Sequence, residues 1–317
     1  MNINKYWLRL ADTDIAREVR VRIADFSWRM EYIRGIRDRD FAWKVRRRMF
    51  HDRNPLFTIL QDKCKVKEYA KARGVRTADL LFVTDRPETI PFEDLPLNCF
   101  IKANHGATWN ILRVESDFYW YGDGSGLISD RGSHVDQERA LRYKLTREEC
   151  VSLCQKWLRR DWLHREWAYR DIPRCIIVEE MLTSRDKAPL IDYRLYTFNG
   201  SVKAISVGSP RYRRNRENAF FDPAWRPFTL TKYREKLPDP LPGKPDSLEQ
   251  MILAAGELGH DLDFARIDLY DTAQGVVLGE ITLYPESGHR GTPTACRDFN
   301  KWLGDQWVLP RKDAQQH

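Results

Sequence analysis

Two short runs near the C-terminal end, residues 264–270 and 276–282, constrain the fold more than any other feature of the chain. Each run alternates apolar and polar residues, which is the pattern of a strand with one buried face. Residues 271–275 lie between the runs and end in glycine, as hairpin loops often do. The sequence therefore predicts a β-hairpin with one polar face.

The polar face of this hairpin carries an unusual set of side chains. Folding the chain about residue 274 places Asp268 opposite Glu280 and Arg266 opposite Thr282, with all four on one face because strand side chains repeat with period two. Directly opposed carboxylates have Cβ atoms about 4.5–5.5 Å apart and repel each other. A cation between them relieves the repulsion, and oxygen ligands favour Mg²⁺. The alternative is an exposed hairpin with scattered charge.

Composition limits the class of protein. The 317 residues are 42% hydrophobic and 31% charged, which is typical of a soluble protein with two or three small domains or one composite core. No apolar run approaches the roughly 18 residues of a bilayer span, and the N-terminus lacks an apolar signal core. We therefore expect a cytoplasmic protein. Its six cysteines form no CxxC pair, so free thiols are expected rather than zinc ligands or disulfides.

The net charge of +7 favours a polyanionic partner. Nucleic acid, an anionic membrane, an acidic glycan and nucleotide phosphates all fit this charge. The basic residues crowd into residues 1–55, where apolar positions recur at helical spacing. This pattern predicts helices that either face a polyanion or membrane or present a solvated face paired with nearby acids. The arginine run at residues 46–48 is part of that expected surface.

A phosphate-binding loop is predicted in the first half of the chain. Residues 62–73 read as a helix, and residues 99–114 read as two strands joined by a turn of small residues. Lys102 lies at the end of the first strand, and His105 and Gly106 lie in the turn. Backbone N–H groups and a lysine suit phosphate. An ordinary hairpin is the alternative.

The middle of the chain is rich in glycine and then in tryptophan. Residues 119–126 contain three glycines but lack the ending of a Walker motif, so we expect a cover loop or an insertion. Residues 136–169 read as a helix with tryptophan and arginine interleaved. Such a helix either stacks on sugars or bases or buries its tryptophans in the core.

Further elements follow in the second half. Residues 175–182 predict an apolar strand that runs into a polar hinge, and residues 191–207 predict a hairpin turned by Asn199 and Gly200. A basic, proline-rich loop is expected over residues 209–246, and an amphipathic helix over residues 247–260.

The order of these parts resembles the ATP-grasp superfamily. Within it, the chain looks most like the teichuronopeptide-biosynthesis-like branch, which is associated with bacterial polysaccharide biosynthesis. The likeness runs from about residue 50 to residue 290. It is carried by residues 52–56, 62–63, 101–106, 178–182, 192–200, 266–270 and 279–282.

This resemblance implies an α+β fold in which two α+β subdomains sandwich ATP, preceded by a basic helical N-terminal segment. We expect this segment over residues 1–60, the first subdomains over residues 61–174, and the subdomain with the metal site over residues 175–317.

The resemblance also implies roles in nucleotide binding. Lys63 and Lys102 would contact the ATP phosphates, together with the turn that follows Lys102. Glu179 and Glu180 would line the adenine pocket at the hinge, largely through backbone groups. Asp192 would lie near the ribose or the edge of the pocket.

The hairpin would then supply the metal site. Asp268 and Glu280 would hold Mg²⁺ that bridges the ATP phosphates, with Thr282 beside them where many ATP-grasp ligases have Asn. Arg266 would face the charge that develops at the acyl centre.

The implied activity is that of an ATP-dependent carboxylate–amine ligase. The γ-phosphoryl group activates a carboxylate as an acylphosphate, an amine displaces the phosphate, and ADP is released; such chemistry needs positioning and charge neutralisation. The expected partners are an amine and a carboxylate or anionic glycan, because the arginines of residues 34–48 and 211–216 suit acidic sugars, with polysaccharide machinery near a membrane. A kinase acting on a hydroxyl and a nucleic-acid-binding protein are the alternatives, the latter the less expected.

Overall fold

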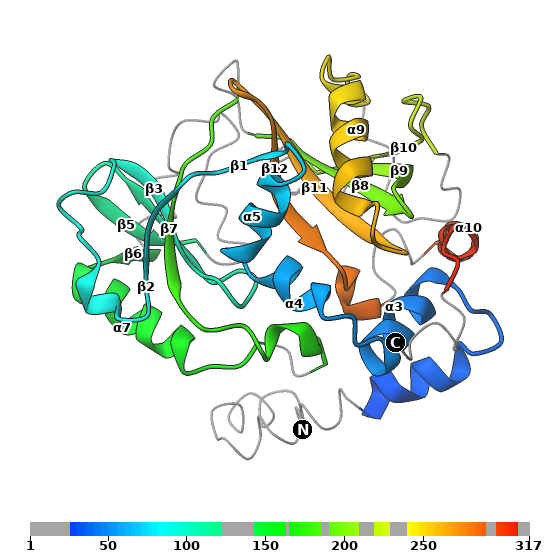
Figure 1. The fold of residues 1–317 in the computed structure, drawn as a ribbon, viewed down its shortest axis with the longest axis horizontal. Coiled ribbons are helices and arrows are strands. Elements are labelled where there is room, and N and C mark those ends of the chain that lie inside the picture. Colours follow the sequence, from blue (N-terminus) through cyan, green and yellow to red (C-terminus); the bar gives the residue numbers. More distant parts are fainter. Residues whose placement is uncertain are drawn as a thin grey trace, which may run out of the picture.

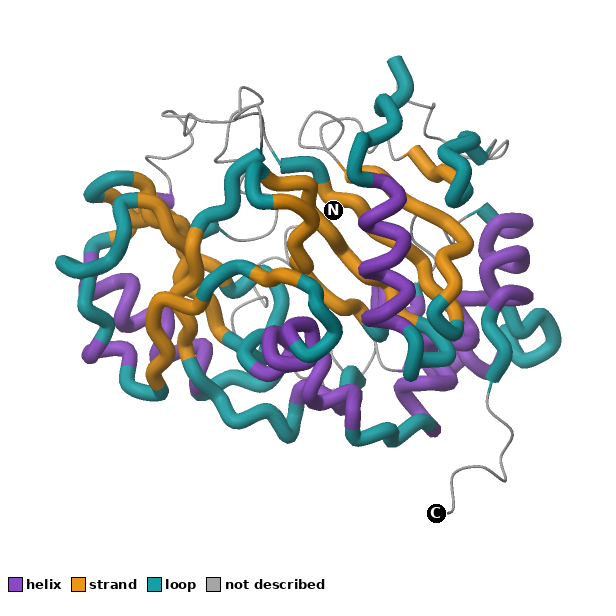
Figure 2. Tube along the Cα trace, turned by 45° about the horizontal axis from the view of Figure 1, so that its top comes forward, coloured by secondary structure: helices purple, strands orange, loops and turns teal. Residues whose placement is uncertain are grey.

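The computed structural model describes residues 26–121, 143–162, 165–184, 190–208, 219–228, 240–289 and 296–309. The chain forms two sheets, each with its own helices, that lie side by side (Figures 1 and 2). We call them body A and body B. Most of the glycine-rich run at residues 119–126, and all of the arginine run at residues 211–216, lie outside the described residues.

Body A contains a six-stranded sheet in the order β1-β12-β11-β8-β9-β10. Strand β1 pairs with β12 in parallel, and the other neighbours are antiparallel. The strands span Arg76–Thr77 (β1), Asp192–Phe198 (β8), Ser201–Gly208 (β9), Ala219–Phe221 (β10), Ala265–Thr272 (β11) and Gly275–Thr282 (β12).

Body B contains an antiparallel sheet in the order β2-β7-β3-β4-β5-β6. Its strands span Leu80–Thr84 (β2), Asn98–Ala103 (β3), Asn110–Val114 (β4), Asp117–Trp120 (β5), Lys144–Leu145 (β6) and Ile176–Glu180 (β7).

Both predicted hairpins of body A are confirmed. In the hairpin β11–β12, Asp268 pairs with Glu280 and Arg266 pairs with Thr282. A bulge at Gly279 sets this register, and a Cβ at Gly279 would lie 2.5 Å from the ring of Tyr270, so only glycine fits. The hairpin β8–β9 turns at residues 199–200, which both have positive φ, as the two-residue turn requires.

Two of the expected helices differ in extent from the structure. The helix expected over residues 62–73 begins only at Lys65. In the described parts of residues 136–169, α7 ends at Leu158 and a separate 3₁₀ turn follows. Trp157 and Trp167 are buried there, so they do not offer a stacking surface. The helices span Phe41–His51 (α3), Leu56–Gln61 (α4), Lys65–Lys71 (α5), Arg147–Leu158 (α7), Leu248–Gly259 (α9) and Arg297–Gln306 (α10), with 3₁₀ turns at Pro87–Thr89 (η1), Trp167–Tyr169 (η2) and Pro285–Gly288 (η3).

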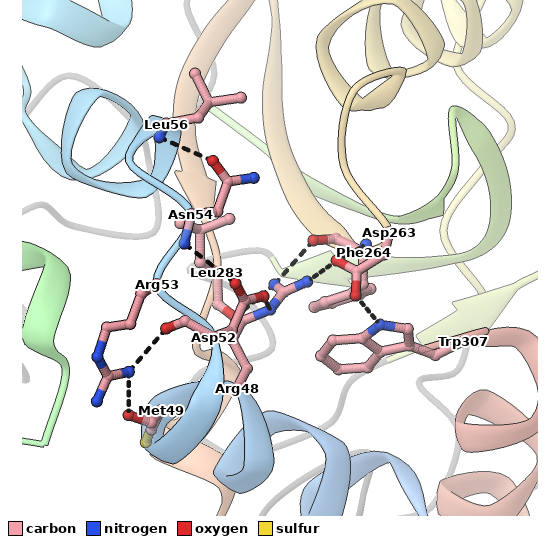
Figure 3. A network of polar contacts seen from close by, with 10 residues as sticks. All are labelled: Arg48, Met49, Asp52, Arg53, Asn54, Leu56, Asp263, Phe264, Leu283 and Trp307. Atoms are coloured by element: carbon pink, nitrogen blue, oxygen red, sulfur yellow. Dashed lines mark hydrogen bonds and ion pairs between the residues drawn. The ribbon is translucent and has the colours of Figure 1, made fainter. Parts of the chain in front are cut away.

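The expectation that the arginine run at residues 46–48 forms part of an exposed surface is wrong for two of its residues. Arg46 and Arg48 are each 1% exposed. The guanidinium of Arg48 donates to the carbonyls of Phe264 and Leu283, at 2.9 and 3.1 Å, and pairs with Asp263 (Figure 3). Helix α3 is therefore packed into body A, and these two arginines are unavailable to a polyanion or a membrane.

Each body has a separate hydrophobic core. The core of body A joins α3, α4 and α5 to β8–β12, α9 and α10, whereas the core of body B lies between residues 90 and 178. Strand β7 follows residue 174 yet pairs with β2 and β3, so the sheets do not divide at the expected boundary. No helix in the described ranges is long and apolar enough to cross a membrane.

Candidate functional site

A cavity of about 220 Å³ lies between the two bodies. Body A contributes the polar face of β8, β11 and β12, and body B contributes β3, β7 and the turn after β3. Helix α9 packs on the opposite face of the body A sheet, where Gly259 abuts Thr197. The cavity is lined by Leu60, Gln61, Lys63, Val66, Lys67, Thr77, Lys102, Ala107, Thr108, Asn110, Glu179, Asp192, Asp268, Tyr270, Leu278, Gly279, Glu280 and Ile281.

The body A wall is acidic. Asp268 is 5% exposed and accepts two hydrogen bonds from Arg266, at 2.7 and 2.6 Å. Burial raises the pKa of Asp268 to about 6, although the charge of Arg266 opposes this rise. Thr282 accepts a hydrogen bond of 2.9 Å from Arg266. Opposite Asp268, Glu280 faces the cavity. A buried carboxylate of raised pKa gains most from an added cation.

The body B wall carries paired lysines. Glu179 accepts from Lys102 at 2.6 Å and from Lys67 at 2.8 Å. Burial by itself would raise the pKa of Glu179, but the two lysines outweigh it and lower the pKa to about 2. Glu179 therefore stays ionised and holds both ammonium groups at the cavity, where an anionic ligand can reach them.

A third lysine comes from the segment between α4 and α5. The ammonium of Lys63 donates to the carbonyl of Gly106, and burial lowers the pKa of Lys63. Its backbone N–H donates to the carbonyl of Asn104 at 3.2 Å. This contact ties body A to the turn of body B that was expected to bind phosphate.

The structure brings together most of the site predicted from the sequence. Six of the expected residues line one cavity, although they come from six separate segments: Lys63, Lys102, Glu179, Asp192, Asp268 and Glu280. Two more, Arg266 and Thr282, lie directly behind Asp268.

Three expected residues have other contacts. His105 is buried and lies within 3.2–3.3 Å of the carbonyls of Trp157 and Arg160, so it supports the turn from behind. Gly106 contributes its carbonyl to Lys63. Glu180 accepts from the backbone N–H of Asp79, at 2.9 Å, and does not line the cavity.

Sequence reasoning missed several lining residues, notably Lys67 and Tyr270. Lys67 follows Lys63 by four residues, and residues at that spacing share one face of a helix, so its place beside Lys63 was open to prediction. Tyr270 continues the alternation Arg266, Asp268, Tyr270 on the polar face of β11.

The residues fit Mg²⁺ bound together with a phosphate-bearing ligand. Four acids and three lysines face the cavity, so a polyphosphate needs an added cation to balance its charge. No group of three or more His, Cys, Asp or Glu side chains suited to a metal occurs within the described ranges. Two facing carboxylates are nevertheless what Mg²⁺ usually takes when phosphate and water complete its shell.

A comparison of the sequence with models of protein families identifies the family of this chain. A family model described as TupA-like ATPgrasp matches residues 128–308, more than half of the chain. This protein belongs to the TupA-like ATP-grasp family. The α+β architecture and the resemblance expected from the sequence are thereby confirmed. No curated protein sequence matches this TupA-like chain.

Solved ligase structures are distantly similar to the TupA-like protein. D-alanine–D-alanine ligase of Bacillus anthracis, complexed with ATP, is 13% identical over 78% of this chain and 63% of its own, with a TM-score of 0.43. The Helicobacter pylori enzyme is 17% identical over 80% and 62%, with a TM-score of 0.42. A RiPP-associated ATP-grasp ligase of Chryseobacterium gregarium, complexed with ADP and peptides, is 12% identical over 80% and 61%, with a TM-score of 0.38. The chain spans less than two thirds of each.

Proposed function

We propose that this protein is a Mg²⁺- and ATP-dependent carboxylate–amine ligase. The observation that carries the proposal is the pairing of Asp268 and Glu280 across a cavity from Lys63 and Lys102, in a chain of an ATP-grasp family. The acids lie on body A and Lys102 lies on body B, so a nucleotide between them would contact both bodies.

Each residue then has a task set by its chemistry. Lys63 and Lys102 would bind phosphate oxygens, and Asp268 and Glu280 would hold Mg²⁺, which would supply positive charge to the phosphates. Arg266, whose guanidinium is fixed by Asp268 and Thr282, would stabilise the negative charge that develops on the oxygen of the acyl group. Such preorganised donors act strongly where water is excluded.

The reaction joins two substrates in two steps. A carboxylate oxygen attacks the γ-phosphorus and ADP leaves, which gives an acylphosphate. The amine nitrogen then forms a bond to the acyl carbon, loses a proton and displaces phosphate. Both steps need positioning and charge neutralisation rather than a protein nucleophile.

We further propose an acidic sugar of a surface polysaccharide as the carboxylate, with an amino acid or other amine as the second substrate. The net charge of +7 supports an anionic partner. The buried Arg46 and Arg48 cannot contact such a partner, so the other arginines of the chain are the candidates for binding it.

An assay of ADP release tests this proposal. The protein is incubated with Mg²⁺-ATP and a panel of uronic acids and amino acids, and the products are weighed by mass spectrometry. We expect ADP, without AMP, when an acid and an amine are both present, together with an amide product. A phosphorylated hydroxyl product would instead identify a kinase.

The substitution Asp268→Asn tests the metal site in the same assay. We expect a loss of ADP release on the order of 100-fold or more, because one Mg²⁺ ligand loses its charge. Asp261→Asn is the matched control, since Asp261 is half exposed and pairs with Arg73 at the surface. Unchanged turnover in Asp268→Asn would overturn the metal site.

A further inference from the structure

Two cysteines meet beside the cavity, although 111 residues separate them in the chain. The Sγ atoms of Cys64 and Cys175 lie 3.6 Å apart, and both residues are partly exposed. Cys64 lies directly after Lys63 and begins α5 of body A, whereas Cys175 lies directly before β7 of body B. The thiols therefore face each other across the junction between the two bodies.

A buried asparagine holds the two cysteine segments together. Asn104 is 1% exposed, and its side chain accepts from the backbone N–H of Cys175 at 2.9 Å and donates to Asp62 at 3.0 Å. Asp62 in turn accepts from the backbone N–H of Cys64, at 2.9 Å. The backbone N–H of Asn104 donates to the carbonyl of Cys175 at 3.1 Å. The distance between the thiols is thus set by a network of hydrogen bonds.

We propose that Cys64 and Cys175 form a redox-active dithiol, which peroxide converts to a disulfide that links body A to body B. A disulfide needs the sulfurs at about 2.05 Å, so the pair must close by roughly 1.5 Å from its present separation. Partial exposure gives a small oxidant access to both sulfur atoms.

The oxidation balances with hydrogen peroxide as the oxidant. The thiolate of one cysteine attacks a peroxide oxygen, the O–O bond breaks, and a sulfenic acid and hydroxide form. The second thiol then attacks the sulfenic sulfur, and the S–O bond breaks as the S–S bond forms. Two electrons pass from the sulfurs to peroxide, and the two thiol protons end in two molecules of water.

The other four cysteines differ from this pair in burial. Cys99, Cys150, Cys154 and Cys296 are all buried. Burial raises the pKa of Cys99 to about 11 and that of Cys150 to about 12. By contrast, the hydrogen bond with Cys64 lowers the pKa of Cys175. Since the thiolate is the reactive form and both sulfurs of the pair are partly exposed, Cys64 and Cys175 are more open to peroxide than the four buried cysteines.

The disulfide acts on the cavity through its neighbours. Cys64 is bonded to Lys63 in the chain, and Cys175 leads into the strand that carries Glu179, the partner of Lys102 and Lys67. A covalent bond here fixes the two walls relative to each other and shifts Lys63. Ligand entry between the walls, and the position of the phosphates, both depend on these elements.

Peptide mapping of peroxide-treated full-length protein, without reduction, tests the disulfide itself. We expect one cross-linked pair of peptides containing Cys64 and Cys175, lighter by the mass of two hydrogens, and a higher unfolding midpoint that returns to its former value after thiol reduction. Cys64→Ser and Cys175→Ser should show neither change. A pair formed by other cysteines, or sulfinic acid on Cys175 without a cross-link, would overturn the proposal.

A second arm measures ADP release, which rests on the proposed ligase activity, whereas the mapping does not. We expect oxidation to lower ADP release on the order of 100-fold in the native protein, with recovery after reduction, and to spare both serine variants. Equal losses in Cys175→Ser would show that oxidation acts elsewhere. Absence of ADP release in the reduced protein would refute the ligase activity, while the mapping would still decide the disulfide.

Discussion

Two arginines of body A, the buried Arg48 and the half-buried Arg266, contact the same hairpin and differ in what binds them. Arg48 contacts the open end of β11–β12 and donates to two backbone carbonyls, and the rings of Phe57, Phe264 and Trp307 surround it (Figure 3). Arg266 lies within the hairpin and donates only to side chains, those of Asp268 and Thr282.

This difference separates a structural charge from a functional one. The fold fixes the positions of backbone carbonyls, so the hydrogen bonds of Arg48 hold the hairpin to α3. The partners of Arg266 line or adjoin a cavity and can be shared with a ligand. Arg48 is 1% exposed and Arg266 is 14% exposed, but their hydrogen-bond partners separate the two roles.

The substitution Arg48→Met should destabilise the protein most. It leaves two buried carbonyls without a donor and Asp263 without its cation, and loss of one partner of a buried pair costs about 3–5 kcal/mol. Denaturant unfolding followed by circular dichroism measures the change. Arg47→Met is the control, because Arg47 is a partly exposed neighbour in the same helix. Equal stability of the two variants would contradict the structural role of Arg48.

In contrast to Arg48→Met, the substitution Arg266→Met should reduce activity more than stability. We expect ADP release to fall by about 10²–10³, as for other donors that stabilise developing charge. Stability should fall less than in Arg48→Met, because the pKa of Asp268 is already about 6 and its carboxyl can take a proton. Parallel unfolding and turnover measurements on both variants test this. A larger stability loss in Arg266→Met would remove the contrast.

Glu166 gives a third anchor near the end of the hairpin, because its carboxyl accepts from Ser287 and Trp162. Burial raises its pKa to about 7. The folded state then keeps a proton on Glu166 that the unfolded state releases above about pH 4.5. The contribution of this protonated carboxyl to stability is therefore fully present below about pH 4.5. It falls as the pH rises toward 7, by up to roughly 3 kcal/mol.

Thermal unfolding of Glu166→Gln between pH 4 and pH 8 tests this prediction. The decline between pH 4.5 and pH 7 should be smaller in the variant than in the native protein, by up to roughly 3 kcal/mol, while the part due to Asp268, whose pKa is about 6, remains. Glu179→Gln is the matched control, since the pKa of Glu179 is about 2 and its contribution is lost only as the pH falls toward that value. A native profile that is flat from pH 4.5 to pH 7 would show that Glu166 stays ionised.

The smallest effect is expected at Asn54, which connects α3 to α4. Its side-chain oxygen accepts from the backbone N–H of Leu56 at 3.0 Å (Figure 3). Asn54→Ala should cost about 1 kcal/mol, as for other residues that cap a helix start, and leave ADP release unchanged. Loss of turnover without loss of stability would move this segment into the site.

Local patterns predicted the strands well. Alternation predicted the pairing of Asp268 with Glu280, although the turn is shorter than the expected loop over residues 271–275 and a bulge at Gly279 restores the predicted register. The turn at Asn199 and Gly200 was readable from its two residues. The six lining residues followed from the order of motifs. Each of these inferences depended either on residues close together in the chain or on the resemblance to a family whose fold is known.

Contacts between distant segments were not readable. Arginine runs normally face water, so nothing local marked Arg48, whose partners lie more than 200 residues away. Cys64 and Cys175 looked like unrelated thiols because no spacing rule joins them. His105 sits in a turn typical of phosphate loops, yet its ring lies within hydrogen-bond distance of the carbonyls of Trp157 and Arg160.

The two hydrophobic cores can be completed at different stages of synthesis. Body B is built from one continuous stretch, and its first and last strands pair, with Leu80 opposite Glu179. Body A needs residues before β2 as well as residues after β7. During synthesis from the N-terminus, where domains generally fold as units, body B can close first. Helices α3–α5, although synthesised before body B, must then wait for β8–β12, which makes them among the latest elements of the described chain to be buried.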